Sequence, residues 1–122
     1  MRFAGNGISG YSGDGGQATS ATFRNPSHLS YDPSGAIIVS EVWNHRIRRV
    51  SVDSGIITTI AGNGNAGFTG DGGLATVASL SYPYHAMYGP DGCLYIADMY
   101  NFAVRKVDTQ GYMSTLAGTG ER

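Results

Sequence analysis

Two histidines at equivalent positions of an internal repeat are the side chains best suited to metal chemistry. His28 and His85 lie about 57 residues apart, and each follows a proline by two residues. Imidazole is a common zinc ligand, but a catalytic zinc usually takes about three protein ligands, so this pair is one short. We therefore expect hydrogen-bonded histidines and predict no metal site and no cofactor.

Two aspartates lie in glycine-rich loops that resemble glycine-aspartate calcium sites. Each loop supplies one carboxylate, whereas Ca²⁺ takes about six to eight oxygen ligands. We expect each aspartate to accept amide hydrogen bonds within its own turn. The repeated loop motif, which we interpret as structural, comprises Gly13, Asp14, Gly15, Gly16, Gly70, Asp71, Gly72 and Gly73.

The same loops contain the G-x-G-x-x-G spacing of dinucleotide-binding proteins, at residues 5–10 and 62–67. That fingerprint requires a helix to begin at the glycines, so that its amides meet a pyrophosphate, but here more glycines follow. Glycine also serves loops that need several positive φ angles. We therefore predict no nucleotide site. No serine stands in a nucleophilic arrangement, and Cys93 begins a buried-looking strand, so no catalytic residue is predicted.

Basic residues concentrate in two segments with equivalent positions in the repeat, Arg46, Arg48 and Arg49 in the first and Arg105 and Lys106 in the second. The net charge of the chain is −1, whereas nucleic-acid binding normally leaves a basic excess. In a strand Arg46 and Arg48 point opposite to Arg49. We predict a solvated, partly paired face, with Arg46 as a candidate contact residue and no nucleic-acid partner.

Trp43 and Tyr100 occupy equivalent loop positions in the two repeats. Large aromatic side chains in such loops serve either as anchors for a protein partner or as packing between repeat units. The sequence leaves both roles open.

The repeat itself defines the elements that position these residues. Repeat 1 covers about residues 4–60, repeat 2 about 61–116, and residues 117–122 start a further repeat within a single domain spanning 1–122. Each repeat has four apolar segments bounded by Gly, Pro, Asp and Ser turns, which predicts four short antiparallel strands. The predicted strands are 28–31, 36–40, 46–52 and 56–60, then 86–88, 93–97, 103–107 and 112–116. Only residues 17–23 and 74–80 are expected to hold a helical turn.

Four short strands per repeat of this length are typical of a β-propeller blade, so the predicted fold class is all-β, with two four-stranded blades. Segments 38–50 and 95–107 also resemble the signature of NHL repeats, in a long-loop variety found in many bacterial proteins and large cell-surface proteins. The resemblance implies blades of a propeller that usually has about six.

The resemblance also identifies a structural motif of acidic, amide and arginine side chains that recurs in each blade. We expect these side chains to satisfy one another inside the blade rather than to catalyse, because a catalytic role would not need two copies. Glu41 departs from the pattern, since its counterpart is an aspartate. The motif residues are Asn44, Arg48, Asp98, Asn101 and Arg105.

As a function we predict a non-catalytic interaction scaffold whose partner is a protein. One alternative is a metal-dependent propeller enzyme resembling the amidating lyases or lactonases, with His28 and His85 in its channel. Another is an extracellular structural or sensor domain of a larger protein. The sequence shows neither a signal peptide nor a membrane span of about 20 apolar residues, and it leaves the compartment open.

Two blades alone would each leave an apolar face without a neighbour. We therefore expect the chain to belong to a longer protein, to form a head-to-tail homotrimer with six blades, or to aggregate.

Overall fold

The structure, a computed structural model, describes residues 1–121. They form two four-stranded antiparallel sheets with strand orders β1-β2-β3-β4 and β5-β6-β7-β8. The predicted all-β class is confirmed. The first sheet comprises β1 (Pro26–Tyr31), β2 (Ile37–Glu41), β3 (Arg46–Val50) and β4 (Ile57–Ala61), and the second comprises β5 (Pro83–Tyr88), β6 (Leu94–Asp98), β7 (Ala103–Val107) and β8 (Met113–Ala117).

The first strand of each sheet begins earlier than the sequence predicts. β1 starts at Pro26 and β5 at Pro83, which suits a residue that has no N–H to donate to the ladder. In both strands the pairing register shifts between the proline and the histidine two residues later. This bulge places one extra residue in the strand and so changes the side to which His28 and His85 point.

Short 3₁₀ turns connect the strands. η1 (Ala18–Ser20) and η3 (Ala75–Val77) lie in the two segments where helical turns are predicted. The prediction that only those segments hold such turns is wrong, because η2 (Val42–Asn44) and η4 (Met99–Asn101) follow β2 and β6. Each ends at a residue with φ of 52°, which reverses the chain into the next strand. Within the described residues, no helix is long and apolar enough to cross a membrane.

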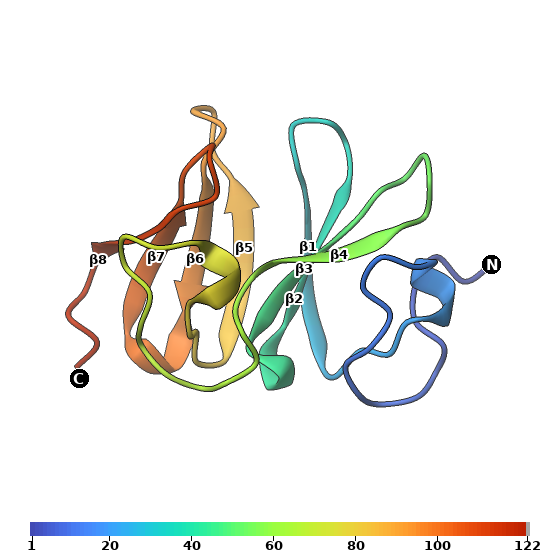
Figure 1. The fold of residues 1–122 in the computed structure, drawn as a ribbon, viewed down its shortest axis with the longest axis horizontal. Helices are drawn as coiled ribbons and strands as arrows, with labels where there is room; N and C mark the ends of the chain where they lie inside the picture. The colour runs from blue at the N-terminus through green and yellow to red at the C-terminus, as the bar shows by residue number, and fades with distance from the viewer. Residues whose placement is uncertain (122) are drawn as a thin grey trace.

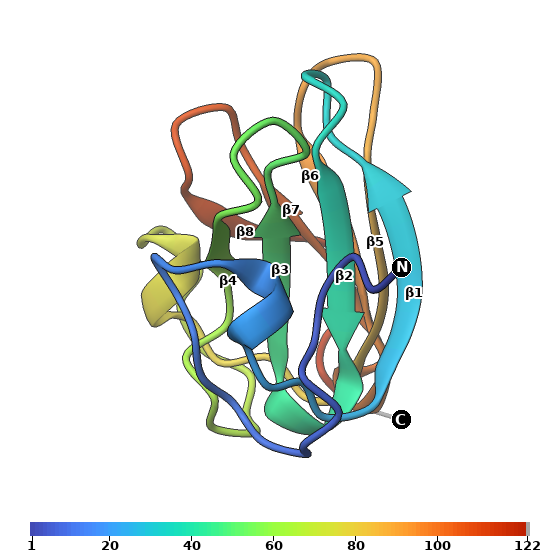
Figure 2. The same ribbon diagram turned by 90° about the vertical axis from the view of Figure 1, so that its right-hand side faces the viewer.

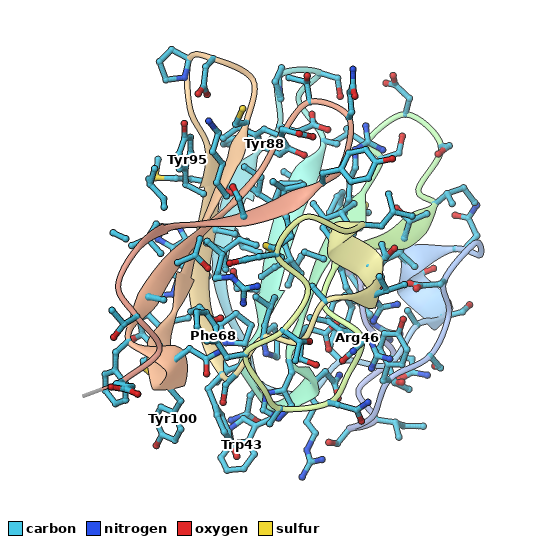
Figure 3. All side chains as sticks on the ribbon, turned by 60° about the vertical axis from the view of Figure 1, so that its left-hand side comes forward. Trp43, Arg46, Phe68, Tyr88, Tyr95 and Tyr100 are labelled. Carbon is cyan, nitrogen blue, oxygen red and sulfur yellow. The ribbon has the colours of Figure 1, made fainter. Side chains whose placement is uncertain are left out.

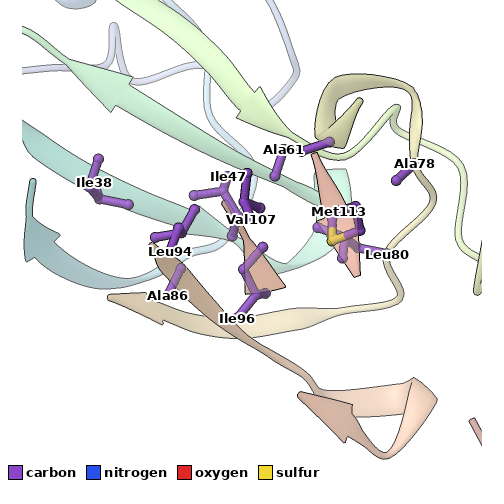
Figure 4. Packing of buried hydrophobic residues seen from close by; sticks show 11 residues of the cluster. Ile38, Ile47, Ala61, Ala78, Leu80, Ala86, Leu94, Ile96, Val107 and Met113 are labelled. Carbon is purple, nitrogen blue, oxygen red and sulfur yellow. The ribbon is translucent and has the colours of Figure 1, made fainter. Parts of the chain in front are cut away.

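The two sheets stand side by side, with the chain ends at opposite ends of the long axis (Figure 1). The view from the N-terminal end shows the second sheet behind the first (Figure 2). Strand β5 lies against β1, β2 and β3. The main hydrophobic cluster fills this junction with side chains from both sheets and the intervening loop (Figure 4): Ile38, Ile47, Ala61, Ala75, Ala78, Leu80, Ala86, Leu94, Ile96, Val107 and Met113.

A glycine-rich loop precedes each sheet and folds over its third and fourth strands. The loop between β4 and β5 is fixed by a hydrogen bond from the Gly62 N–H to the Ala75 carbonyl of 2.9 Å. The corresponding bond in the N-terminal loop joins the Gly5 N–H to the Ala18 carbonyl at 2.8 Å. A smaller cluster beneath the N-terminal loop contains Ala18, Ala21, Val39, Val50 and Ile57.

Candidate functional site

Each sheet buries one arginine of its third strand beneath its glycine-rich loop. The Arg48 side chain is fully buried. Its Nη1 donates to Glu41 Oε2 at 2.9 Å and to the Thr22 carbonyl at 3.1 Å. Its Nη2 donates to the Ser12 carbonyl at 2.8 Å and to Asp14 Oδ1 at 2.9 Å. One guanidinium therefore joins the loop to the sheet.

The second sheet repeats this arrangement around Arg105, also fully buried. Its Nη1 donates to Asp98 Oδ2 at 3.0 Å and to the Ser79 carbonyl at 3.2 Å. Its Nη2 donates to the Thr69 carbonyl at 2.7 Å and to Asp71 Oδ1 at 3.1 Å. The burial of both arginines differs from the solvated basic face that strand alternation predicts, because the loop closes over one side of the strand.

The acid of each network receives further donors from its own sheet. Asp98 Oδ1 accepts from the Ser81 N–H at 2.7 Å, and Oδ2 accepts from Asn101 Nδ2 at 2.7 Å. Glu41 accepts from the equivalent donors, the Arg24 N–H and Asn44 Nδ2, although both donate to Oε1. The longer side chain of Glu41 thus keeps the pattern of Asp98. Buried carboxylates with several donors are satisfied ions, which supports a structural role.

The loop aspartates differ from the sequence expectation. Asp14 accepts hydrogen bonds from Arg48, from the Tyr11 hydroxyl at 2.7 Å and from the Thr59 hydroxyl at 2.6 Å, rather than from amides of its own turn. Burial alone would raise the pKa of Asp14, but the hydrogen bonds from Thr59 and Tyr11 and the charge of Arg48 lower it overall. Asp71 likewise accepts from Arg105 and from Thr115. Each aspartate lies in the loop that covers the buried arginine, so its carboxylate is within hydrogen-bond reach of the guanidinium.

An aromatic surface, defined by Trp43, Tyr82 and Tyr100, lies where the two sheets meet (Figure 3, where Trp43 and Tyr100 are labelled). The Trp43 and Tyr82 rings meet edge to face at 5.3 Å, and the Tyr82 and Tyr100 rings are 4.5 Å apart. Trp43 is nevertheless 45% exposed and Tyr100 59% exposed. The two roles that the sequence leaves open are therefore compatible, because the rings pack between the sheets and present apolar surface to solvent.

His45 joins the two sheets in a way that the sequence reasoning missed. Its Nδ1 accepts a hydrogen bond from the Tyr82 N–H at 3.0 Å, and the two rings meet edge to face at 4.6 Å. Burial lowers the pKa of His45. The charge of Asp98 partly offsets this effect, and the charges of Arg24 and Arg46 add to it. The only available signal was that His45 has no histidine counterpart in the second repeat.

Arg46, a candidate contact residue, lies between the two glycine-rich loops. Its guanidinium carbon is 3.5 Å from the centre of the Tyr11 ring, and its Nη2 donates to the Asn63 carbonyl at 3.0 Å. The structure thus places Arg46 away from the aromatic surface (Figure 3). A cation held between an aromatic ring and a carbonyl stabilises loop packing.

His28 and His85 are brought together on the neighbouring strands β1 and β5. Their ring centres are 4.4 Å apart, and the Tyr84 ring lies 4.7 Å from His28. Burial and the neighbouring His28 lower the pKa of His85. Among the described residues, His28 Nδ1 is buried without a hydrogen-bond partner. Among residues 1–121 no group of three His, Cys, Asp or Glu side chains could hold a metal, so the pair does not by itself fit a catalytic zinc.

The fold and these networks define two propeller-like blades, each an antiparallel sheet of four strands closed by a glycine-rich loop and a buried arginine. Residues 5–115 match the model of a family described as a domain of unknown function, DUF7133. The chain belongs to this family.

Solved structures with similar folds include a protein of unknown function from Bacteroides thetaiotaomicron, with a TM-score of 0.73 and 23% identity over 87% of this chain and 26% of that one. Virginiamycin B lyase from Staphylococcus aureus has a TM-score of 0.56 and 21% identity over 82% of this chain and 29% of the lyase. At these identities the likeness shows the fold alone. Mouse Teneurin-1 is 29% identical over 102 residues, which cover 74% of this chain and 4% of Teneurin-1. The chain thus spans a small part of the relatives that it matches.

Proposed function

We propose that this chain is a segment of an NHL-type propeller that binds a protein partner through the aromatic surface and has no catalytic activity of its own. The single observation that carries the proposal is the half-exposed state of Trp43 and Tyr100 around Tyr82. Such rings offer a large apolar contact at little cost in conformational entropy, which is typical of the residues that dominate binding energy at protein interfaces.

The position of the aromatic surface supports the same role. Trp43 belongs to η2 and Tyr100 to η4, two turns whose following strands are anchored by the buried arginines. Arg24 lies near the surface, with its guanidinium carbon 5.7 Å from the centre of the Trp43 ring. Binding residues held on a rigid scaffold lose little freedom when a partner docks.

The NHL-type assignment rests on segments 38–50 and 95–107 and on the acid, amide and arginine motif that the two sheets share. The similarity to Teneurin-1 supports a place within a larger protein. The enzyme alternative receives less support, because His28 and His85 would need a third metal ligand from another blade or chain.

The proposal is tested by comparing partners captured by the immobilised wild-type chain with those captured by the variant Trp43→Ala/Tyr100→Ala. Val52→Ala is the control, because Val52 is exposed in the turn between β3 and β4. A true partner changes the fluorescence of Trp43, the one tryptophan of the chain. We expect the partner to bind the double variant about 100-fold or more weakly than the wild-type chain, because the variant removes two central aromatic contacts. Calorimetry then measures the affinity of a captured partner for the wild-type chain, the control and the double variant. Equal affinities for these three chains would overturn the proposal.

A further inference from the structure

The charged side chains of the protein are distributed unevenly between the two ends of its sheets. The turns that join β1 to β2, β3 to β4, β5 to β6 and β7 to β8 lie at one end, whereas η2 and η4, which carry the aromatic surface, lie at the other (Figure 1). Among residues 1–121, three aspartates in the first set of turns form no salt bridge: Asp53, Asp91 and Asp108.

The acids beside the aromatic surface are already neutralised. Glu41 precedes η2 and Asp98 precedes η4, and both carboxylates are fully buried. Glu41 pairs with Arg48 at 2.9 Å, and Asp98 pairs with Arg105 at 3.0 Å. These two acids therefore do little to repel a carboxylate that approaches the aromatic surface.

Arg24 is an exposed cation at the edge of the aromatic surface. Its guanidinium carbon is 5.7 Å from the centre of the Trp43 ring, and among residues 1–121 it forms no salt bridge. Its backbone N–H donates to Glu41 Oε1 at 3.0 Å, which fixes this part of the chain, while the charge of Glu41 is balanced by Arg48. Arg24 thus offers its positive charge beside an exposed aromatic ring.

Arg46 adds a second positive charge at the same end of the sheets. An aromatic ring and a backbone carbonyl of the glycine-rich loops hold its guanidinium, and neither group carries a negative charge. Burial lowers the pKa of His45, and the charges of Arg24 and Arg46 lower it further, against the charge of Asp98. Cations at this end would steer an acidic partner over about 8 Å at physiological salt.

We propose that the partner of the aromatic surface is an acidic protein segment, in which a carboxylate pairs with Arg24 and a neighbouring apolar side chain packs on the three rings. This inference rests on the proposed function, because it names the chemistry of the partner at the same surface. A guanidinium presents several N–H donors in one plane and can bind a carboxylate through two of them. Apolar contacts around such a pair exclude water and strengthen it.

Aromatic rings beside an arginine also occur where single-stranded nucleic acids bind. That mode needs a series of cations along the phosphate backbone, because each neutralised phosphate adds to the affinity. Arg46 lies away from the aromatic surface, and the buried Arg48 and Arg105 are already paired. One arginine at the rings fits a carboxylate of a protein segment better than a run of phosphates.

The first step of the test is a display library of random short peptides, selected on the immobilised wild-type chain. We expect enrichment of peptides in which Asp or Glu lies next to Leu, Phe or Tyr. An enriched peptide without tryptophan is then synthesised in two forms, as selected and with Lys in place of each acid. Binding of both forms is followed by the fluorescence of Trp43, the one tryptophan of the chain.

Charge reversal at Arg24 is the second step. Arg24→Glu should bind the acidic peptide about tenfold or more weakly than wild type, and should bind the lysine form more tightly than wild type does. Lys106→Glu is the control with the same change of charge, because Lys106 lies beside Tyr95, away from the aromatic surface (Figure 3). It should bind the acidic peptide almost as tightly as wild type. Circular dichroism checks folding, and Arg24→Gln replaces Arg24→Glu if that chain unfolds.

Several results would overturn the inference. They are a library that yields no peptide or only peptides without acids, equal affinities of Arg24→Glu and Lys106→Glu for the acidic peptide, and tighter binding of oligo-dT than of any enriched peptide. If Trp43→Ala/Tyr100→Ala loses the peptide while Arg24→Glu keeps it, the inference fails and the proposed function stands. A double variant that binds the peptide like wild type would overturn both.

Discussion

The imidazole of His45 accepts a hydrogen bond from the backbone N–H of Tyr82 at 3.0 Å, and so links the turn after β2 to the residue before β5. This bond requires an unprotonated Nδ1, which agrees with the lowered pKa of His45. The same Tyr82 ring contacts Trp43 and Tyr100. One hydrogen bond therefore helps to position all three rings of the aromatic surface.

Replacing His45 with alanine should lower the free energy of unfolding by about 1–3 kcal/mol, because the Tyr82 N–H loses its acceptor in a partly buried place. Urea unfolding at neutral pH measures this change. His45→Gln, which retains an acceptor, should lose less. An alanine variant as stable as wild type would show that the bond contributes nothing to the junction.

The stability of the wild-type chain should fall as the pH drops below about 6.5, the ordinary pKa of histidine. The folded-state pKa values of His45 and His85 are lowered, first by burial, so the unfolded chain binds protons more readily in this window. Their stabilisation is complete above a pH of about 6.5 and is lost toward the lower folded-state values. Urea unfolding between pH values of about 7 and 5 should show a smaller slope for His45→Gln, whereas an unchanged slope would mean that His45 does not titrate in this window.

Replacing Arg105 with alanine should lower the free energy of unfolding by about 3–5 kcal/mol, because Asp98 is left as a buried charge without its main partner. Arg48→Ala should act similarly through Glu41. Lys106→Ala is the matched control on the same strand, and we expect a change within about 0.5 kcal/mol for it. Thermal and chemical unfolding compare the three variants. Equal effects of Arg105→Ala and Lys106→Ala would refute the structural role of the network.

Two glycines of one loop should respond differently to alanine. A Cβ on Gly70 would clash with the Cβ of Ala78, whereas one on Gly72 would meet nothing within 4 Å. Both have positive φ, of 100° and 89°, so both variants carry backbone strain of about 1–2 kcal/mol. Gly70→Ala should cost at least about 1–3 kcal/mol more, because the loop must move away from η3. Equal melting temperatures would show that the close packing of the loop is not needed.

Asp32 should contribute to acid stability. It accepts hydrogen bonds from Ser34 and Ala36 and pairs with Arg49 at 2.6 Å. Burial alone would raise its pKa, but the hydrogen bonds from Ser34, Arg49 and the backbone lower it from 3.8 to about 2. Its stabilisation, at most about 2 kcal/mol and reduced by solvent screening, is present above pH 3.8 and lost toward pH 2. Asp32→Asn should therefore be less stable than wild type at a pH of about 6 but not at a pH of about 2, and a pH-independent difference would show that the Asp32 charge is not the cause.

The strands could be predicted because their apolar segments and turn residues recur in two copies, which makes each assignment a check on the other. The burial of Arg48 could not, because strand alternation shows which side chains share a face but not whether a loop covers that face. For the same reason, the sequence did not show that Asp14 accepts hydrogen bonds from Arg48, Tyr11 and Thr59. The contact of His45 with Tyr82 was missed because it joins different repeats and occurs at one junction, where periodicity carries no signal.

Our central proposal is that the chain binds a protein partner and is not a metal enzyme. The most direct measurement is a calorimetric titration of Zn²⁺ into the purified wild-type chain, with its metal content and assembly state read on the same sample. His28→Ala and His85→Ala are titrated beside it. We predict that no zinc binds at a fixed ratio to chain or assembly. Stoichiometric binding that either histidine variant abolishes would contradict the proposal and support the enzyme alternative.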